Sequence, residues 1–182
     1  MSRNVIFELV QYNWYARRRF LDSMAELAWA QVVESCGASF DSIRNVFVHS
    51  LQAEQVWIRR LAGKSTEGVY DTPFSTYHNV DALRAYADTV EAETHEYLET
   101  ATDAELKRTF EYERRDGTRY RYATADVLLH VIEEEIHHRG ELLCLFWQRD
   151  LRPPYTSYLH FKERAEEERH VASSDAREAK TP

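Results

Sequence analysis

The chain has 182 residues, of which 43% are hydrophobic and 13% aromatic, so it can bury a core and is not globally disordered. Its formal net charge of −8 argues against nucleic acid as a partner, because phosphate binding requires clustered positive charge. Two cysteines give no disulfide framework, and no apolar run approaches the roughly 20 residues of a membrane span. We therefore expect a soluble cytoplasmic protein that does not bind membranes.

Four long segments carry apolar residues at spacings of three and four, which is the period of an amphipathic helix. The first is expected over residues 4–36 and the second from 39–42 to 63. The third is expected from 79–81 to 100, and the fourth from 124–126 to 149. Serines at 39 and 42 are good N-cap residues, and Gly63 is a good residue to end a helix.

The pattern changes between the third and fourth helices. In TFEYERRDGTRYRYAT, aromatic and charged residues alternate on both sides of Asp116-Gly117, which predicts a β-hairpin. A capping-box pattern at 102–105 predicts a short helix just before it. Residues 162–182 are charged and nearly free of large apolar side chains, so we expect a mobile tail after a domain of residues 1–161. The expected fold is all-α, an antiparallel four-helix bundle with a small hairpin between the third and fourth long helices.

The last long helix concentrates histidine and glutamate in ADVLLHVIEEEIHHRGELL, residues 125–143. Side chains four residues apart share a helix face, so His130, Glu134 and His138 form one ladder beside apolar positions. A hydrated surface with charge pairs would also explain these residues, but an inward carboxylate is costly unless it is paired or metal-bound. Gly140 costs ~1 kcal/mol relative to alanine within a helix. It predicts close approach by a neighbouring segment, or a local kink.

His49 lies on an apolar stripe of the second helix. A single histidine in such a position is commonly a core residue, but facing helices can bring ligands together on one ion. Two histidines and a carboxylate are the ligand set of open zinc sites and of non-haem iron sites. The zincin motif fails because position 134 is glutamate rather than the second histidine. A di-iron site would need Glu-x-x-His on two helices, and both copies lie on the last helix, so a single metal fits better.

Over about residues 4–160 the sequence resembles the DinB/YfiT-like four-helix-bundle metalloproteins. The matching stretches are LVQYNWYARRRFLDSM, SFDSIRNVFVHSLQAEQVWIRRLAG, LLHVIEEEIHHRGELLCLF and RPPYTSYL. The resemblance implies that His49, Glu134 and His138 bind one divalent metal, with Glu134 at a position where the family usually has histidine. Zinc, nickel, iron and manganese are all compatible with such ligands.

Members of this family with known activity are often transferases of low-molecular-weight thiols such as bacillithiol or mycothiol. The resemblance therefore implies an enzyme that transfers such a thiol to a small electrophile or hydrolyses a small substrate, and it favours a homodimer. His130, His137, Arg139 and Glu54 become candidates for orienting the metal ligands or the substrate. The spacing of Glu54 from His49 is more typical of a surface glutamate. The alternative is a bundle that binds a metal or a small molecule without catalysis.

Overall fold

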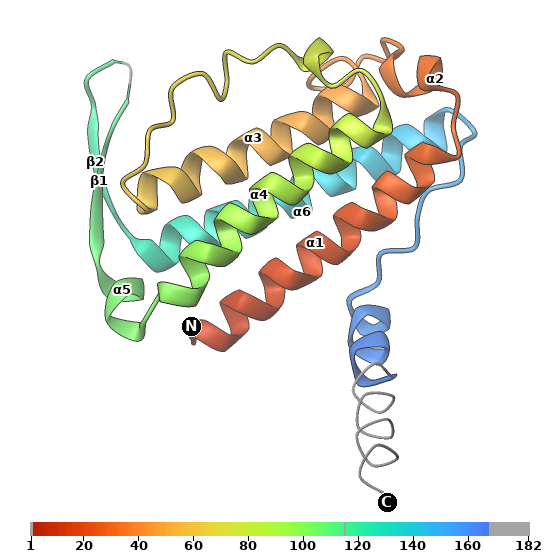
Figure 1. Cartoon of the computed structure of the whole chain (residues 1–182). Coiled ribbons are helices and arrows are strands. Elements are labelled where there is room, and N and C mark those ends of the chain that lie inside the picture. Colours follow the sequence, from red (N-terminus) through yellow and green to blue (C-terminus); the bar gives the residue numbers. More distant parts are fainter. Residues whose placement is uncertain (1, 115, 168–182) are drawn as a thin grey trace, which may run out of the picture.

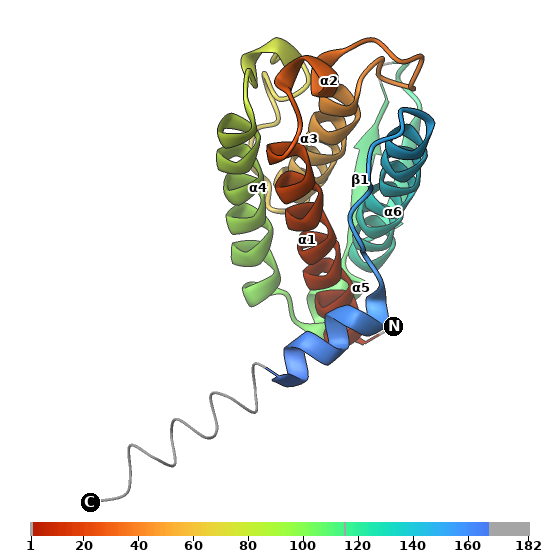
Figure 2. The ribbon, with the colours of Figure 1, turned by 90° about the vertical axis from the view of Figure 1, so that its right-hand side faces the viewer.

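The computed structural model describes residues 2–114 and 116–167 (Figure 1). Four long helices lie along one another, as two views at right angles show (Figure 1, Figure 2). They are α1 (Arg3–Ala25), α3 (Ile43–Leu61), α4 (Val80–Thr100) and α6 (Thr124–Gln148). The α3 helix packs against α4 and α6, and α1 packs against the same two helices. The shorter helical elements are α2 (Trp29–Val33), η1 (Phe74–Thr76) and α5 (Asp103–Lys107).

Two of the long helices begin and end where the sequence predicts. The Ser42 side chain accepts a hydrogen bond from the Asn45 N–H at the start of α3, and Asn79 accepts one from Ala82 at the start of α4. Beyond the end of α3, Gly63 has a φ of 66°, a left-handed conformation that glycine adopts without strain. The predicted cap residues therefore set these boundaries.

The first predicted helix is wrong in its length. The α1 helix ends at Ala25, the backbone at Ala28 is extended, and the separate short helix α2 follows. This break allows Val32 to be fully buried in the core beside α1 and α3. Neither glycine nor proline marks the break, so the apolar spacing alone gave no signal for it.

The predicted hairpin is confirmed. Strands β1 (Thr109–Glu113) and β2 (Arg119–Ala123) pair antiparallel, with Tyr112 opposite Tyr120. Gly117 in the turn has a φ of 82°, the conformation for which the Asp-Gly pair is suited. The two strands form a small sheet beside the end of the molecule where α6 begins (Figure 1). The prediction of a mostly helical protein with one hairpin is thus confirmed.

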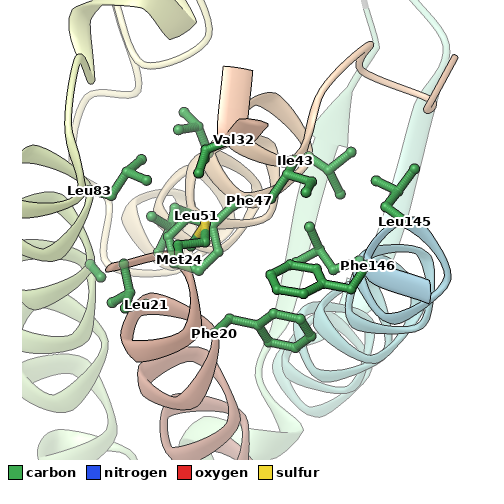
Figure 3. Close-up of a cluster of buried hydrophobic side chains, with 14 of the residues drawn as sticks. Phe20, Leu21, Met24, Val32, Ile43, Phe47, Leu51, Leu83, Leu145 and Phe146 are labelled. Atoms are coloured by element: carbon green, nitrogen blue, oxygen red, sulfur yellow. The ribbon is translucent and has the colours of Figure 1, made fainter. Parts of the chain in front are cut away.

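The buried apolar residues form two clusters along the long helices. Figure 3 shows the first, built from α1, α2, α3, α4 and α6 and including Phe20, Met24, Phe47, Leu83 and Phe146. The second lies toward the start of α1 and of α6, and includes Ile6, Val10, Ile58, Leu98 and Leu128. Along α1, α3 and α6, the residues between the two clusters include charged ones, so a polar layer crosses the interior.

A buried ion triad forms that polar layer. The Arg17 guanidinium donates to Glu54 at 2.5 Å and to the two oxygens of Glu135 at 3.2 and 3.3 Å. Burial opposes the charge on Arg17, but the neighbouring Glu135 and Glu54 carboxylates together raise its pKa above the ordinary value. Trp14 and Thr94 also donate hydrogen bonds to Glu54, at 3.2 and 2.6 Å. The triad thereby joins α1 to α3 and α6.

After α6 the chain returns alongside α1, where a helical stretch covers residues 158–167 (Figure 2). The Tyr12 hydroxyl donates to the Thr156 carbonyl at 2.7 Å, and the Lys162 ammonium lies 3.0 Å from Glu8. This stretch crosses the predicted domain end at residue 161, and residues 168–182 of the predicted tail lie outside the described residues. Within residues 2–114 and 116–167, no helix is both long enough and apolar enough to cross a bilayer.

Candidate metal centre

The α3 and α6 helices bring together the three residues predicted to bind a metal. One ring nitrogen each from His49 and His138 and one carboxylate oxygen of Glu134 all lie within 4.8 Å of one another. The Nε2 atom of His138 is 3.5 Å from the Oε2 atom of Glu134, and the rings of His49 and His138 have centroids 5.0 Å apart. Residues from two different helices thus present nitrogen and oxygen donors to one small region.

The spacing of these donors suits a divalent metal. Tetrahedral zinc, with ligand distances of ~2.0–2.2 Å, separates its donors by about 3.4 Å. The His138–Glu134 distance of 3.5 Å already matches that value. The other donor atoms of the group are at most 4.8 Å apart, so small side-chain rotations would bring them to the same spacing. Within the described part of the chain, no fourth histidine, cysteine or carboxylate joins this group. Three protein ligands with a further position open is the pattern of a catalytic site.

His49 is held in the neutral form that a metal requires. Its ring stacks on Phe40 with a centroid distance of 3.7 Å and an interplanar angle of 19°. Burial, reinforced by the neighbouring His138 and only partly opposed by Glu141, lowers the pKa of His49 to about 4. The imidazole therefore keeps a free lone pair at neutral pH.

His138 is oriented by a carboxylate that the sequence did not identify. The Nδ1 atom of buried His138 lies 3.3 Å from Glu141, and Glu141 accepts hydrogen bonds from the N–H and hydroxyl of Ser39, both at 2.7 Å. Burial raises the pKa of Glu141, but the bonds from Ser39 and His138 outweigh it and lower the pKa on balance. A proton on Nδ1 directs the Nε2 lone pair toward Glu134. The spacing of three residues between His138 and Glu141 was the available signal.

The outer end of the predicted ladder differs from expectation. His130 is exposed rather than inward, with Nε2 3.8 Å from the Oε1 atom of Glu134 and its ring 5.4 Å from that of Trp57. His130, Glu133 and Glu134 form a second group with metal-compatible spacing, but His130 and Glu133 are both exposed. Glu134 therefore lies between two histidines, with one oxygen toward each.

The other three candidates lie around the site rather than in it. His137 is exposed, and its ring centroid is 5.0 Å from that of His138. Arg139 is directed toward α1, where it donates to the Asn13 side chain at 3.0 Å and its guanidinium lies 4.6 Å from the ring centroid of Tyr12.

Glu54 is buried within the ion triad, so the expectation of a surface glutamate is wrong. Five residues turn an α-helix by about 140° from His49, which places Glu54 on the side of α3 that faces α1 and α4. Glu54 accepts hydrogen bonds from Trp14, Arg17 and Thr94, and none of these belongs to the metal group. Gly140 also departs from expectation, because an added Cβ atom would meet nothing within 4 Å among the described residues. The predicted close approach is therefore wrong.

Comparison with known proteins agrees with this architecture. The profile of the DinB family matches residues 1–170. YizA from Bacillus subtilis (strain 168) is 24% identical over 147 residues, which is 81% of this chain and 88% of YizA.

Two solved structures share the fold. The crystal structure of a DinB-like protein from Bacillus cereus ATCC 10987 has a TM-score of 0.64 and 19% identity, covering 82% of this chain and 94% of that one. A conserved protein from Enterococcus faecalis has a TM-score of 0.58 and 13% identity, covering 75% and 92%. Since the family profile spans every described residue, this protein belongs to the DinB family.

Proposed function

We propose that this protein, as an antiparallel four-helix bundle, binds one divalent metal at His49, Glu134 and His138 and acts as a metal-dependent enzyme. Its reaction is the transfer of a low-molecular-weight thiol to a small electrophile, or the hydrolysis of a small substrate. The observation that carries the proposal is the convergence of two imidazoles and one carboxylate within 4.8 Å, without a fourth ligand in the described residues. A bound divalent ion would lower the pKa of a thiol or water in the remaining position, which supplies a nucleophile near neutral pH.

The residues of the chain support this chemistry in separate ways. Phe40 fixes the plane of the His49 ring, and Glu141 fixes the orientation of the His138 ring. Ser39 in turn holds Glu141 through two hydrogen bonds. These contacts preorganise both imidazoles, so little reorganisation is needed when the metal binds.

Glu134 sets the character of the metal centre. A carboxylate replaces the histidine that is usual at this position, which makes the loaded site one charge less positive than a site with three imidazoles. Oxygen ligands favour harder ions, so Glu134 shifts preference toward manganese or iron relative to three histidines, while zinc and nickel remain compatible.

The test is turnover by the metal-loaded protein with a panel of low-molecular-weight thiols and a chlorinated aromatic acceptor, followed through conjugate formation. We expect conjugate with the wild type and none with His49→Ala or His138→Ala. The matched control is His78→Ala, because His78 is an exposed histidine of the 64–79 segment and is not in the metal group. Hydrolysis is tested with the same variants on an ester panel.

The alternative is a bundle that binds metal without catalysis. It predicts stoichiometric metal in the wild type and no turnover on any thiol or ester of the panel. Retained turnover in both histidine variants would contradict a metal-dependent reaction at this site.

A further inference from the structure

A pocket of about 330 Å³ opens between α3, the hairpin and the start of α6. Its walls are the rings of Trp57, Tyr112 and Tyr122, together with one valine of α6. The Trp57 and Tyr112 rings have centroids 5.3 Å apart at an interplanar angle of 60°. This volume is at the lower end of the range for small-molecule sites, which are typically lined by aromatic and apolar side chains with few polar groups.

Arg60 does not line the pocket, but its guanidinium contacts two of these rings. Its guanidinium carbon lies 4.7 Å from the ring centroid of Trp57 and 4.6 Å from that of Tyr112. Cation–π contacts of this kind hold aromatic side chains in place, and they occupy ring surface that a cationic ligand would otherwise use. The arrangement therefore disfavours an ammonium ligand.

The polar groups at the pocket favour an anion. Arg114 lines it, and its guanidinium lies 4.6 Å from the Tyr120 ring centroid. Among the described residues no carboxylate lies within 4.0 Å of this guanidinium, although its charge helps to lower the pKa of Asp116 in the turn. Asp126 also lines the pocket, but one of its oxygens already accepts the Ala123 N–H at the start of α6, at 3.2 Å. Arg114 is thus the group available to a ligand carboxylate or similar anion.

The pocket adjoins the metal centre through one side chain. His130 lines the pocket and also lies 3.8 Å from Glu134, whose other oxygen is 3.5 Å from His138. A molecule in contact with His130 is therefore separated from the candidate metal ligand Glu134 by that one side chain.

Another pocket, of about 830 Å³, lies at the C-terminal end of α3, beside α4 and α5, and differs from the aromatic pocket in its charged groups. Its charges are already paired, Lys64 with Glu96 at 2.8 Å and Arg108 with Glu105 at 2.7 Å. Neither pocket is lined by a metal-binding candidate, but the aromatic pocket contains His130, whose Nε2 atom lies 3.8 Å from Glu134.

We propose that the aromatic pocket binds the small substrate of the metal centre through a planar aromatic ring, with an anionic substituent paired to Arg114. The substrate class is thus an aromatic anion. This inference rests on the proposed function for the role of the bound molecule, but the binding itself does not require a metal.

The experiment measures binding of 2-naphthoate to the full-length protein, metal-free and zinc-loaded, by calorimetry. Two comparison probes are the saturated decalin-2-carboxylate, which keeps the charge, and 2-naphthylmethylammonium, which keeps the rings. We expect naphthoate to bind at least about tenfold more tightly than either, since a charge-assisted contact and aromatic stacking are each worth about that factor. Equal binding of the saturated acid, or preference for the cation, would overturn the inference.

Matched variants locate the binding. Arg114→Gln should weaken naphthoate binding by about tenfold and leave neutral 2-naphthalenemethanol unaffected, because only the ion pair is removed. Arg119→Gln is the control, since Arg119 is an exposed hairpin residue paired with Glu113. Tyr112→Leu should weaken both aromatic probes, whereas Tyr112→Phe keeps the ring and should bind normally. Circular dichroism and the metal content of each variant report whether it is folded.

Failure of this inference and failure of the proposed function are separable. His49→Ala should lose the metal and retain naphthoate binding. A metal-binding, active wild type that does not bind naphthoate, or that binds it equally in Arg114→Gln, would overturn the pocket alone. Naphthoate binding with the expected variant pattern but no metal would overturn the metal-dependent function alone.

Discussion

The rings of His49 and His138 come from different helices, yet their centroids lie 5.0 Å apart with planes at 81°. The two side chains have opposite supports, a stacked phenylalanine for His49 and a carboxylate for His138. Each support fixes a ring without using the nitrogen that would face the metal, so the pair is preorganised for binding.

Glu141 should contribute strongly to metal affinity. Glu141→Gln removes the carboxylate that orients His138, and we expect the affinity for zinc to fall by about 10–100-fold. The measurement is a competition titration against a chelator of known affinity. Glu133→Gln is the control on the same helix, because exposed Glu133 belongs only to the second, outer group of potential ligands. A larger effect of Glu133→Gln would place the metal in that outer group instead.

Arg17 should be essential for stability. Arg17→Met leaves Glu54 and Glu135 buried without their cation, which typically costs about 3–5 kcal/mol of unfolding free energy. Urea denaturation of the wild type and variant measures the difference. Arg84→Met is the matched control, since Arg84 forms an exposed pair with Asp22 and such pairs contribute about 0–1 kcal/mol. Equal losses in both variants would show that the buried triad has no special role.

Glu91 should make stability depend on pH. Burial raises the pKa of Glu91, although Arg17 and Arg18 oppose the shift, and its Oε1 atom is buried without a hydrogen-bond partner among the described residues. The folded protein therefore holds the proton more tightly than the unfolded chain, and this contribution to stability is lost as pH rises through the folded-state pKa.

Glu91→Gln removes that dependence. We expect the variant to have a higher melting temperature than the wild type at pH 7, and the difference to shrink as pH falls from the raised folded-state pKa to the ordinary pKa of 4.5. The lost ion pair with Arg18 matters little, because the Arg18 side chain is largely exposed. A difference between variant and wild type that stays constant from pH 4 to pH 7 would argue against this account.

Gly140 should be replaceable. It lies within α6, is exposed, and has nothing within 4 Å of an added Cβ atom among the described residues. Gly140→Ala should therefore raise the unfolding free energy by ~1 kcal/mol, the difference in helix propensity. Loss of stability, or a change in the apparent mass in solution, would indicate that another chain packs against this position.

The sequence predicts most of the fold because its signals are local. Cap residues such as Ser42 and Asn79, and the Asp-Gly pair at 116–117, determine the backbone only within a few residues. The helix starts and the turn that they form could therefore be predicted from the sequence alone. The end of α1 at Ala25 has no such local signal. It depends on Val32 packing into a core that forms only when distant helices meet.

The same distinction between local signals and contacts with distant segments applies to the candidate site. Helical spacing predicted inward faces for His49, Glu134 and His138, but also for His130, which is exposed. The resemblance to the DinB/YfiT-like proteins selected the first three as the candidate ligands. Glu54 and Glu141 could not be placed correctly, since their positions depend on Arg17 in α1 and on Ser39 in the segment before α3. Spacing within a helix gives the face of a residue, but not which segment covers that face.

The most direct test of the metal centre is the metal content of protein purified without a metal affinity column and then equilibrated separately with zinc, nickel, iron and manganese. The proposal predicts one ion per chain in the wild type and in Glu134→His, where histidine retains or strengthens binding. It predicts none in His49→Ala or His138→Ala, with His78→Ala unchanged. Equal metal content in wild type and His49→Ala, or no binding of any of the four ions by the wild type, would contradict it.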